Sequence, residues 1–128
     1  MEIKGLEFKR IRLSESATHK CRTFKARTGL TPNISCRLAL GISISEPNKP
    51  DINLYSDDSG QEINRYTFLG EHELSLLSLF TIWCHEHKIP QDQYYPYLTA
   101  HINRGVELLV NRVKGIDELS NLLEKVHQ

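Results

Sequence analysis

Two helical patterns meet at a six-residue junction, Thr28-Gly29-Leu30-Thr31-Pro32-Asn33, which limits the possible folds more than any other part of the chain. Gly29 tolerates the left-handed conformation that follows a last helical turn, so the first helix is predicted to end there. Thr31 suits the N-cap of the second helix, and Pro32 suits its first position because no amide hydrogen is needed there. The chain is therefore predicted to turn between two helices.

The segment before this junction is predicted to be a strand followed by a helix. In the extended stretch 8–13, Ile11 and Leu13 point to one face and Arg10 and Arg12 to the other, because strand side chains alternate. Ser14 is the expected N-cap of the helix. The apolar stripe of that helix contains Ala17, Cys21, Phe24 and Thr28, and the cations around it are Lys20, Lys25, Arg27 and, further round, Arg22.

The second helix is apolar on nearly all sides. Cys36 and Leu40 lie opposite a stripe of Ile34, Leu38, Ala39 and Ile42. Such a helix is expected to be buried almost completely, either in the core or against another subunit.

The rest of the chain is predicted to contain a possible short β-hairpin followed by helices. Residues 52–55 and 63–68 look extended and are separated by the turn composition Asp57-Asp58-Ser59-Gly60. The main core helix is expected at 71–87, with a buried arc of Leu76, Leu77, Leu79, Phe80, Trp83 and Cys84. A segment at 94–103 and a helix at 106–113 are expected to be separated by Gly105, and a last helix is expected at 117–126.

These patterns describe one mainly α domain covering residues 1–128. It has a basic strand-helix-turn-helix at 8–43, a possible hairpin at 52–68, and a helical packing and assembly region at 71–126. The strand-helix-turn-helix order is like that of the ribbon-helix-helix unit, in which two chains pair their strands in the major groove. In that arrangement Arg10 and Arg12 would face DNA, and the Gly29 turn and Thr31 helix start would lie near a phosphate.

The formal net charge of zero hides a strong asymmetry. Residues 1–40 contain nine basic and three acidic side chains, a net charge of +6, and the remaining 88 residues carry a net charge of −6. A cationic end on a neutral protein predicts an anionic partner, with phosphate the first choice. The alternative is that the basic end meets the acidic end of a neighbouring subunit.

No pattern in the sequence predicts a catalytic, metal or cofactor site. The three cysteines lie in or beside apolar helical stripes, and their odd number gives no disulfide framework, which predicts a reduced, cytoplasmic environment. No apolar run is long enough to span a membrane. Cys84-His85-Glu86-His87 contains the densest group of possible metal ligands, but only Cys84 and His87 would share a helix face.

Several blocks of the sequence resemble the DndE family. The N-terminal blocks are Arg10-Ile11-Arg12-Leu13-Ser14, the stretch 24–34 around Thr28-Gly29-Leu30-Thr31-Pro32-Asn33, and Cys36-Arg37-Leu38-Ala39. Later blocks are Asn64-Arg65-Tyr66-Thr67-Phe68-Leu69-Gly70-Glu71 and His101-Ile102-Asn103-Arg104-Gly105. Together they extend through nearly the whole chain.

This resemblance implies a small, non-enzymatic, DNA-binding subunit of the bacterial system that replaces a backbone oxygen of DNA with sulfur. The partners that it implies are a cysteine desulfurase, an iron-sulfur sulfurtransferase and an ATPase-like subunit. It further implies a homotetramer that prefers nicked double-stranded DNA. Lys20, Lys25 and Arg27, with the Gly29 turn, are the DNA contacts suggested by the resemblance, and the charge pattern adds Arg10, Arg12 and Arg22.

Two other functions fit parts of the sequence. A ribbon-helix-helix repressor would bind a specific operator sequence. A magnesium-dependent nickase would use the acids around the predicted turn, which are Asp57, Asp58 and Glu62.

Overall fold

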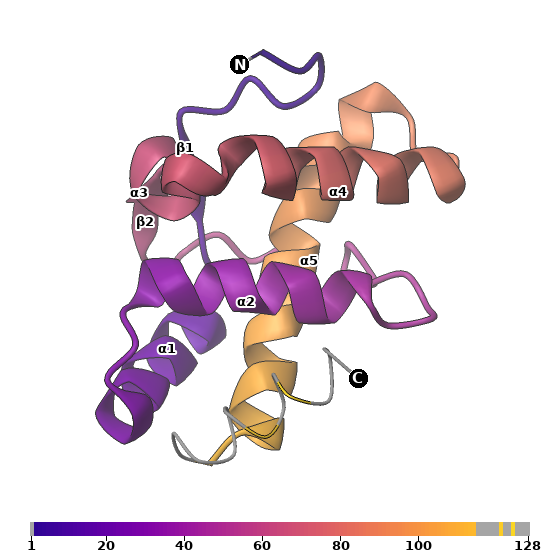
Figure 1. Ribbon diagram of the computed structural model, residues 1–128. Coiled ribbons are helices and arrows are strands. Elements are labelled where there is room, and N and C mark those ends of the chain that lie inside the picture. The colour runs from indigo at the N-terminus through magenta and orange to yellow at the C-terminus, as the bar shows by residue number, and fades with distance from the viewer. Residues whose placement is uncertain (1, 115–120, 122–123, 125–128) are drawn as a thin grey trace.

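The structure, a computed structural model, describes residues 2–114, 121 and 124. In chain order, its elements are β1 (Arg10–Arg12), α1 (Glu15–Thr28), α2 (Pro32–Ile44), β2 (Glu62–Asn64), α3 (Arg65–Leu69), α4 (Glu73–Glu86) and α5 (Tyr94–Arg112). Short 3-10 turns at Gly70–His72 and Gln91–Gln93 precede α4 and α5 (Figure 1). The prediction of a mainly α fold that starts with a strand-helix-turn-helix is confirmed.

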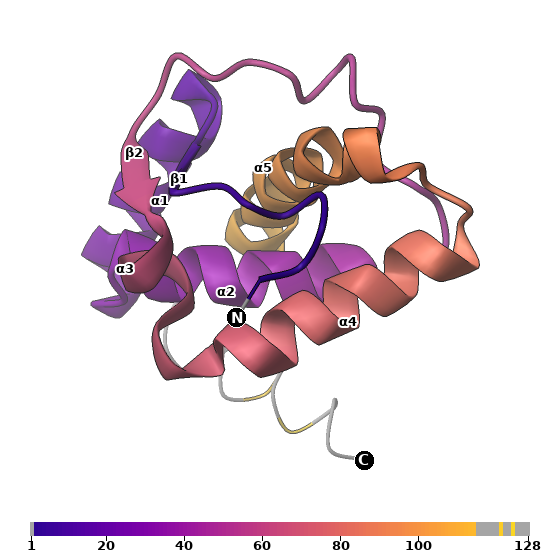
Figure 2. The same ribbon diagram turned by 90° about the horizontal axis from the view of Figure 1, so that it is seen from above.

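The helices pack around α2 and α5, which cross each other at the centre of the molecule. α2 packs most extensively against α5, and it also touches α1, α3 and α4. In Figures 1 and 2, α1 and the two strands lie on one side of the molecule, and α4 runs alongside α2 at another edge. No helix in the described part of the chain is long and apolar enough to cross a membrane.

The boundaries of α1 agree with the capping signals in the sequence. The Oγ of Ser14 accepts a hydrogen bond from the backbone N–H of Ala17 at 2.9 Å, as an N-cap does. Gly29 ends the helix with φ 80°, and its N–H donates to the carbonyl of Lys25 at 2.8 Å. The stripe residues Ala17, Cys21 and Phe24 are all buried, as expected.

One side of α2 is buried in the core of its own chain, where Cys36 and Leu40 are completely buried. The expectation of burial on nearly all sides is met only in part, because Ile34 is 37% exposed and Leu38 and Ile42 are partly buried. Thr31 and Pro32 begin the helix where predicted, but the Thr31 hydroxyl binds the Asn33 side chain and makes no cap hydrogen bond.

The predicted hairpin between 52–55 and 63–68 is wrong. β2 instead pairs antiparallel with β1, and Ile11 lies opposite Ile63 in the register. Residues 52–55 form turns, because the Asp51 side chain accepts hydrogen bonds from the N–H groups of the residues that follow it. The sheet therefore joins residues about fifty positions apart, and it places Ile63 beside Ile11 in the core.

Two further expectations about the helices are also wrong. α5 continues through Gly105 without a break, and this glycine marks a close approach between helices (Figure 1). A Cβ on Gly105 would lie 2.0 Å from the carbonyl oxygen of Ala39 in α2. On α4, Leu79 is 43% exposed rather than buried. The helix predicted at 117–126 lies outside the described residues.

Candidate nucleic-acid interface

The exposed edge of the two-stranded sheet carries Arg10 and Arg12. Both side chains are more than half exposed, and the buried Ile11 between them points the other way, as the strand pattern predicts. Both also face Glu62 of β2: Arg12 Nη2 lies 2.9 Å from Glu62 Oε1, and Arg10 Nε lies 3.5 Å from it. Two cations share one carboxylate, so this edge keeps a net positive charge. Exposed ion pairs of this kind are weak, so an incoming phosphate can compete for the guanidinium groups.

The cations of α1 fall into two groups. Arg22, Lys25 and Arg27 are exposed, and none of them forms an ion pair with a carboxylate within the described residues. Lys20 is half-buried and its Nζ donates to the Oγ of Ser16 at 3.0 Å. It lines a cavity of about 300 Å³ together with Tyr55 and other residues of the 54–57 segment and α5. Lys20 is therefore less available to an external phosphate than the other three cations.

The turn between α1 and α2 completes the basic region. Gly29 is exposed, and a Cβ placed on it would meet no atom within 4 Å, so the turn is open to solvent. Because the Thr31 hydroxyl is directed to Asn33, the start of α2 has no side-chain cap. An uncapped helix start presents amide groups and the positive end of the helix dipole, both of which favour an anion.

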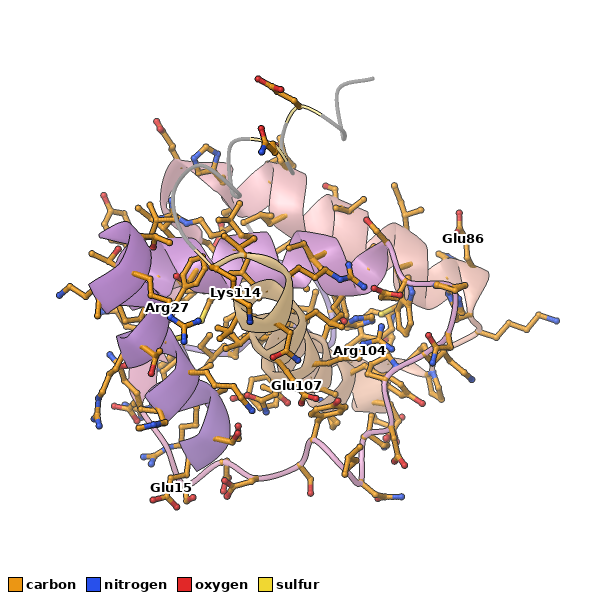
Figure 3. The ribbon with its side chains drawn as sticks, turned by 90° about the horizontal axis from the view of Figure 1, so that it is seen from below. Glu15, Arg27, Glu86, Arg104, Glu107 and Lys114 are labelled. Carbon is orange, nitrogen blue, oxygen red and sulfur yellow. The ribbon has the colours of Figure 1, made fainter. Side chains whose placement is uncertain are left out.

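The elements that carry the predicted site residues lie on one side of the molecule. The sheet, α1 and the turn at Gly29 lie on the same side in two perpendicular views (Figures 1 and 2). Figure 3 also shows Arg27 on the face where Lys114 projects beyond the end of α5. Lys114 was not predicted as a site residue, because it lies 74 residues after the end of the basic segment 1–40.

Three other arginines serve the fold. Arg37 donates to the carbonyls of Phe68 and Thr67 at the end of α3. Arg65 binds Glu73 at 2.7 Å and two backbone carbonyls of the N-terminal segment. Arg104 is buried and donates to Ser43 and to the carbonyl of Asn48. No sequence pattern separates these structural cations from the exposed ones on α1.

Two of the three acids considered for a nickase, Asp57 and Glu62, have structural partners. Asp57 accepts hydrogen bonds from the N–H of Glu15 at 2.9 Å and of Ser59 at 3.1 Å, and these bonds lower the pKa of its carboxyl group. Glu62 faces the two arginines of β1. Within residues 2–114, 121 and 124, no three His, Cys, Asp or Glu side chains are grouped so that they could hold a metal ion.

The three cysteines are buried in the core. The pKa of Cys36 is raised by a hydrogen bond with Cys21 and by burial, and burial raises the pKa of Cys84 to about 12. A thiol with a raised pKa is a poor nucleophile at neutral pH. For Cys36 and Cys84 this agrees with the prediction of packing residues. The hydrogen bond with Cys36 lowers the pKa of Cys21, and it is the burial of Cys21 in the core that agrees with a packing role.

The comparisons with known proteins agree on one family. The sequence profile of the DNA sulphur modification protein DndE matches residues 10–116. The chain belongs to the DndE family. The matched region contains both strands, the Gly29 turn and helices α1 to α5.

Solved structures of DndE share the fold. The crystal structure of DndE from Escherichia coli B7A, a protein involved in DNA phosphorothioation modification, is 24% identical with a TM-score of 0.67. That match covers 80% of this chain and 96% of the E. coli chain. A crystal structure of a DndE double mutant is 21% identical with a TM-score of 0.65, covering 80% of this chain and 97% of the mutant. No curated protein sequence matches the chain.

Proposed function

We propose that this DndE chain is the DNA-binding subunit of a bacterial phosphorothioation machinery. It holds duplex DNA, nicked duplex included, through the backbone phosphates, while partner proteins insert the sulfur. The partners are an iron-sulfur sulfurtransferase and an ATPase-like subunit. In this role the chain binds and positions the DNA, and the sulfur chemistry takes place on the other subunits.

The observation that carries this proposal is the group of exposed cations on α1. Arg22, Lys25 and Arg27 have no carboxylate partner within the described residues, and they lie on the helix that leads to the uncapped start of α2. Cations without partners give up few internal contacts when they bind phosphate, and they release the counterions of DNA. Arg10 and Arg12 extend the positive surface along the sheet edge on the same side of the molecule (Figure 1).

We infer that the chain works as a homo-oligomer, with a tetramer as the expected form. Leu74, Leu79 and Ile82 are large apolar residues on α4, and they are 65%, 43% and 56% exposed. A cluster of exposed apolar side chains on one helix favours an interface between copies. Such an assembly would place several copies of the basic surface along one DNA.

The direct test is a salt titration of DNA binding with the double variant Lys25→Ala/Arg27→Ala. We expect the wild type to bind intact and nicked duplexes with a steep salt dependence and little sequence preference. The variant should bind more weakly, and the slope of log K against log salt should fall by up to about 2, since each phosphate contact contributes about 0.9. Fluorescence anisotropy at several salt concentrations measures both quantities.

The matched control removes the same charge from another place. Lys49→Ala/Lys88→Asn replaces two exposed lysines outside α1 and the sheet, and Asn suits the positive φ of 56° at Lys88. This control should bind DNA like the wild type. Equal affinity of wild type and the Lys25/Arg27 variant would refute the site. Binding restricted to one operator sequence would favour a repressor, and magnesium-dependent nicked circles that disappear in Asp57→Asn/Asp58→Asn would favour a nickase.

A further inference from the structure

Tyr66 is the most exposed large apolar residue in the described part of the chain. Its exposed fraction is 84%, although it lies in α3 between the sheet and the core. Phe68 and Leu69, which follow it in the same short helix, are completely buried and anchor the helix. The Tyr66 ring forms no aromatic contact within the described residues. The fold therefore does not require an aromatic side chain at this position.

The backbone that carries Tyr66 is held at both ends. The Oδ1 of Asn64 caps α3 by accepting from the N–H of Thr67 at 2.7 Å. At the other end, Arg37 Nε donates to the carbonyl of Phe68 at 2.6 Å. The guanidinium group of Arg65 fixes the helix to the N-terminal segment through the carbonyls of Leu6 and Phe8. The exposed ring thus stands on a short helix that is tied down on both sides.

A surface groove of about 570 Å³ runs beside the ring. Its lining includes Phe8, Lys9, Arg65 and Tyr66. The guanidinium carbon of Arg65 lies 4.5 Å from the centre of the Phe8 ring, and the negative charge of Glu73 in the same groove is matched by Arg65 at 2.7 Å. Lys9 is exposed at the rim. The groove thus combines an apolar surface with a cation, and it carries no unmatched negative charge from these residues.

The groove continues the positive edge of the sheet. Asn64, two residues before Tyr66, is the cross-strand neighbour of Arg10. Asn64 and Lys9, the chain neighbour of Arg10, line the groove together with Tyr66, so the groove adjoins the edge that carries the guanidinium groups of β1. Cationic side chains that follow the backbone, next to an aromatic ring that stacks on bases, form the usual arrangement for binding unpaired nucleotides.

From this placement we propose that Tyr66 is a stacking platform for an unpaired nucleobase of the bound DNA, with Lys9 contacting the adjoining phosphate. The proposal rests on the DNA-binding function proposed above and deepens it. It gives the protein a contact that intact duplex cannot make, because bases in a duplex are already stacked on one another. DNA with a displaced or frayed base gains this contact in addition to the phosphate contacts of α1.

The test compares two DNAs and three variants. The DNAs are an intact duplex and the same duplex with one unpaired 2-aminopurine, whose fluorescence falls when it stacks on a ring. Wild type and Tyr66→Phe should quench this fluorescence and bind the unpaired-base DNA more tightly than the intact duplex. Tyr66→Ala should lose the quenching and bind the unpaired-base DNA roughly 5- to 150-fold more weakly, with unchanged affinity for intact duplex. Leu54→Ala, which removes another exposed apolar side chain outside the sheet, α1 and α4, should behave like the wild type.

The possible failures can be told apart. If the wild type binds both DNAs but Tyr66→Ala does so equally well, the stacking proposal is wrong and the DNA-binding function stands. If Tyr66→Phe loses as much as Tyr66→Ala, the hydroxyl group and not the ring makes the contact, which also overturns the proposal. A lower molecular mass of Tyr66→Ala in light scattering would assign the ring to an interface between copies. If the wild type binds neither DNA, the proposed function itself fails.

Discussion

The buried histidine of α5 shows how strongly a single residue can depend on its protonation state. His101 is completely buried, and its Nδ1 lies 2.7 Å from the Oγ of Ser43. Arg104 Nε donates to the same Oγ at 2.9 Å, and a neutral His101 can accept the hydroxyl hydrogen of Ser43 at Nδ1. Burial, with smaller contributions from the charges of Arg104 and His87, lowers the pKa of His101 to about 3.

This lowered pKa predicts a loss of stability in mild acid. The unfolded chain takes up a proton on His101 near its ordinary pKa of about 6.5, and the folded chain does not do so until about 3. The contribution of neutral, buried His101 to the free energy of unfolding is therefore fully present above about pH 6.5. Below that pH it falls by up to about 1.4 kcal/mol per pH unit. We expect the stability difference between wild type and His101→Gln to shrink by about 2–3 kcal/mol between about pH 6.5 and 4.5.

Urea unfolding followed by tryptophan fluorescence measures this difference directly. Trp83 is the only tryptophan, and its ring centre lies 4.2 Å from that of His101, so the signal reports the surroundings of the titrating group. The comparison is controlled because His101→Gln keeps every other titrating group of the wild type. A stability difference that stays constant across this pH range would show that His101 is not the group responsible.

At the scale of the elements, the contact between α2 and α5 depends on one glycine. A Cβ at position 105 would lie 2.0 Å from the carbonyl oxygen of Ala39, which is backbone and cannot rotate away. Gly105→Ala gains about 1 kcal/mol of helix propensity. It should still destabilise the protein by about 1–3 kcal/mol or more, because the two helices must move apart. Thermal or urea unfolding measures this change.

The matching substitution in α2 should have the opposite sign. A Cβ at Gly41 would meet no atom within 4 Å, so Gly41→Ala should stabilise the protein by about 0.5–1 kcal/mol. If both variants were stabilised, the close approach at position 105 would be contradicted.

These two glycines also mark what the sequence could predict. Local signals placed the ends of α1 and α2 correctly, because Ser14, Gly29 and Pro32 act through their own backbone. Gly105 was misread as a helix break because its role depends on α2, more than sixty residues earlier. The hairpin error has the same origin: β2 pairs with β1, about fifty residues earlier, and no local pattern around β2 identifies that partner.

The candidate site was predictable to a similar extent. The strand alternation correctly gave Arg10 and Arg12 on one face, but the shared contact with Glu62 depends on a pairing across fifty residues. The cations of α1 could be listed from the sequence, whereas the half-buried position of Lys20 depends on its surroundings. Tyr66 was not predicted as a site residue, because its exposure depends on the folded chain.

At the scale of the whole molecule, the cations of α1 and the sheet and the exposed apolar side chains of α4 occupy different regions. The cations of α1 and the sheet lie on one side, and the exposed apolar residues of α4 belong to a helix at another edge (Figures 1 and 2). An assembly through α4 would therefore leave the basic surface of each copy open to DNA. The acidic second part of the sequence does not need to cover the cations for the protein to associate.

This separation predicts that association can be removed without loss of the fold. Leu74 and Ile82 are two helical turns apart on α4 and are 65% and 56% exposed, so Leu74→Lys/Ile82→Lys should leave the core intact. We expect the variant to dissociate toward the 14.8 kDa monomer in sedimentation equilibrium, since lysines at an apolar contact are costly to bury. Its DNA binding should weaken because fewer basic surfaces act together.

The matched control for this experiment is Leu54→Lys, which adds a charge at a residue that is 70% exposed in the 52–55 turn segment. It should keep the mass of the wild type, because it lies outside α4. A double variant with unchanged mass would show that α4 is not the contact between copies. A monomeric variant that binds a single DNA as tightly as the wild type would separate assembly from DNA binding and leave α1 and the sheet edge as a complete binding surface in one chain.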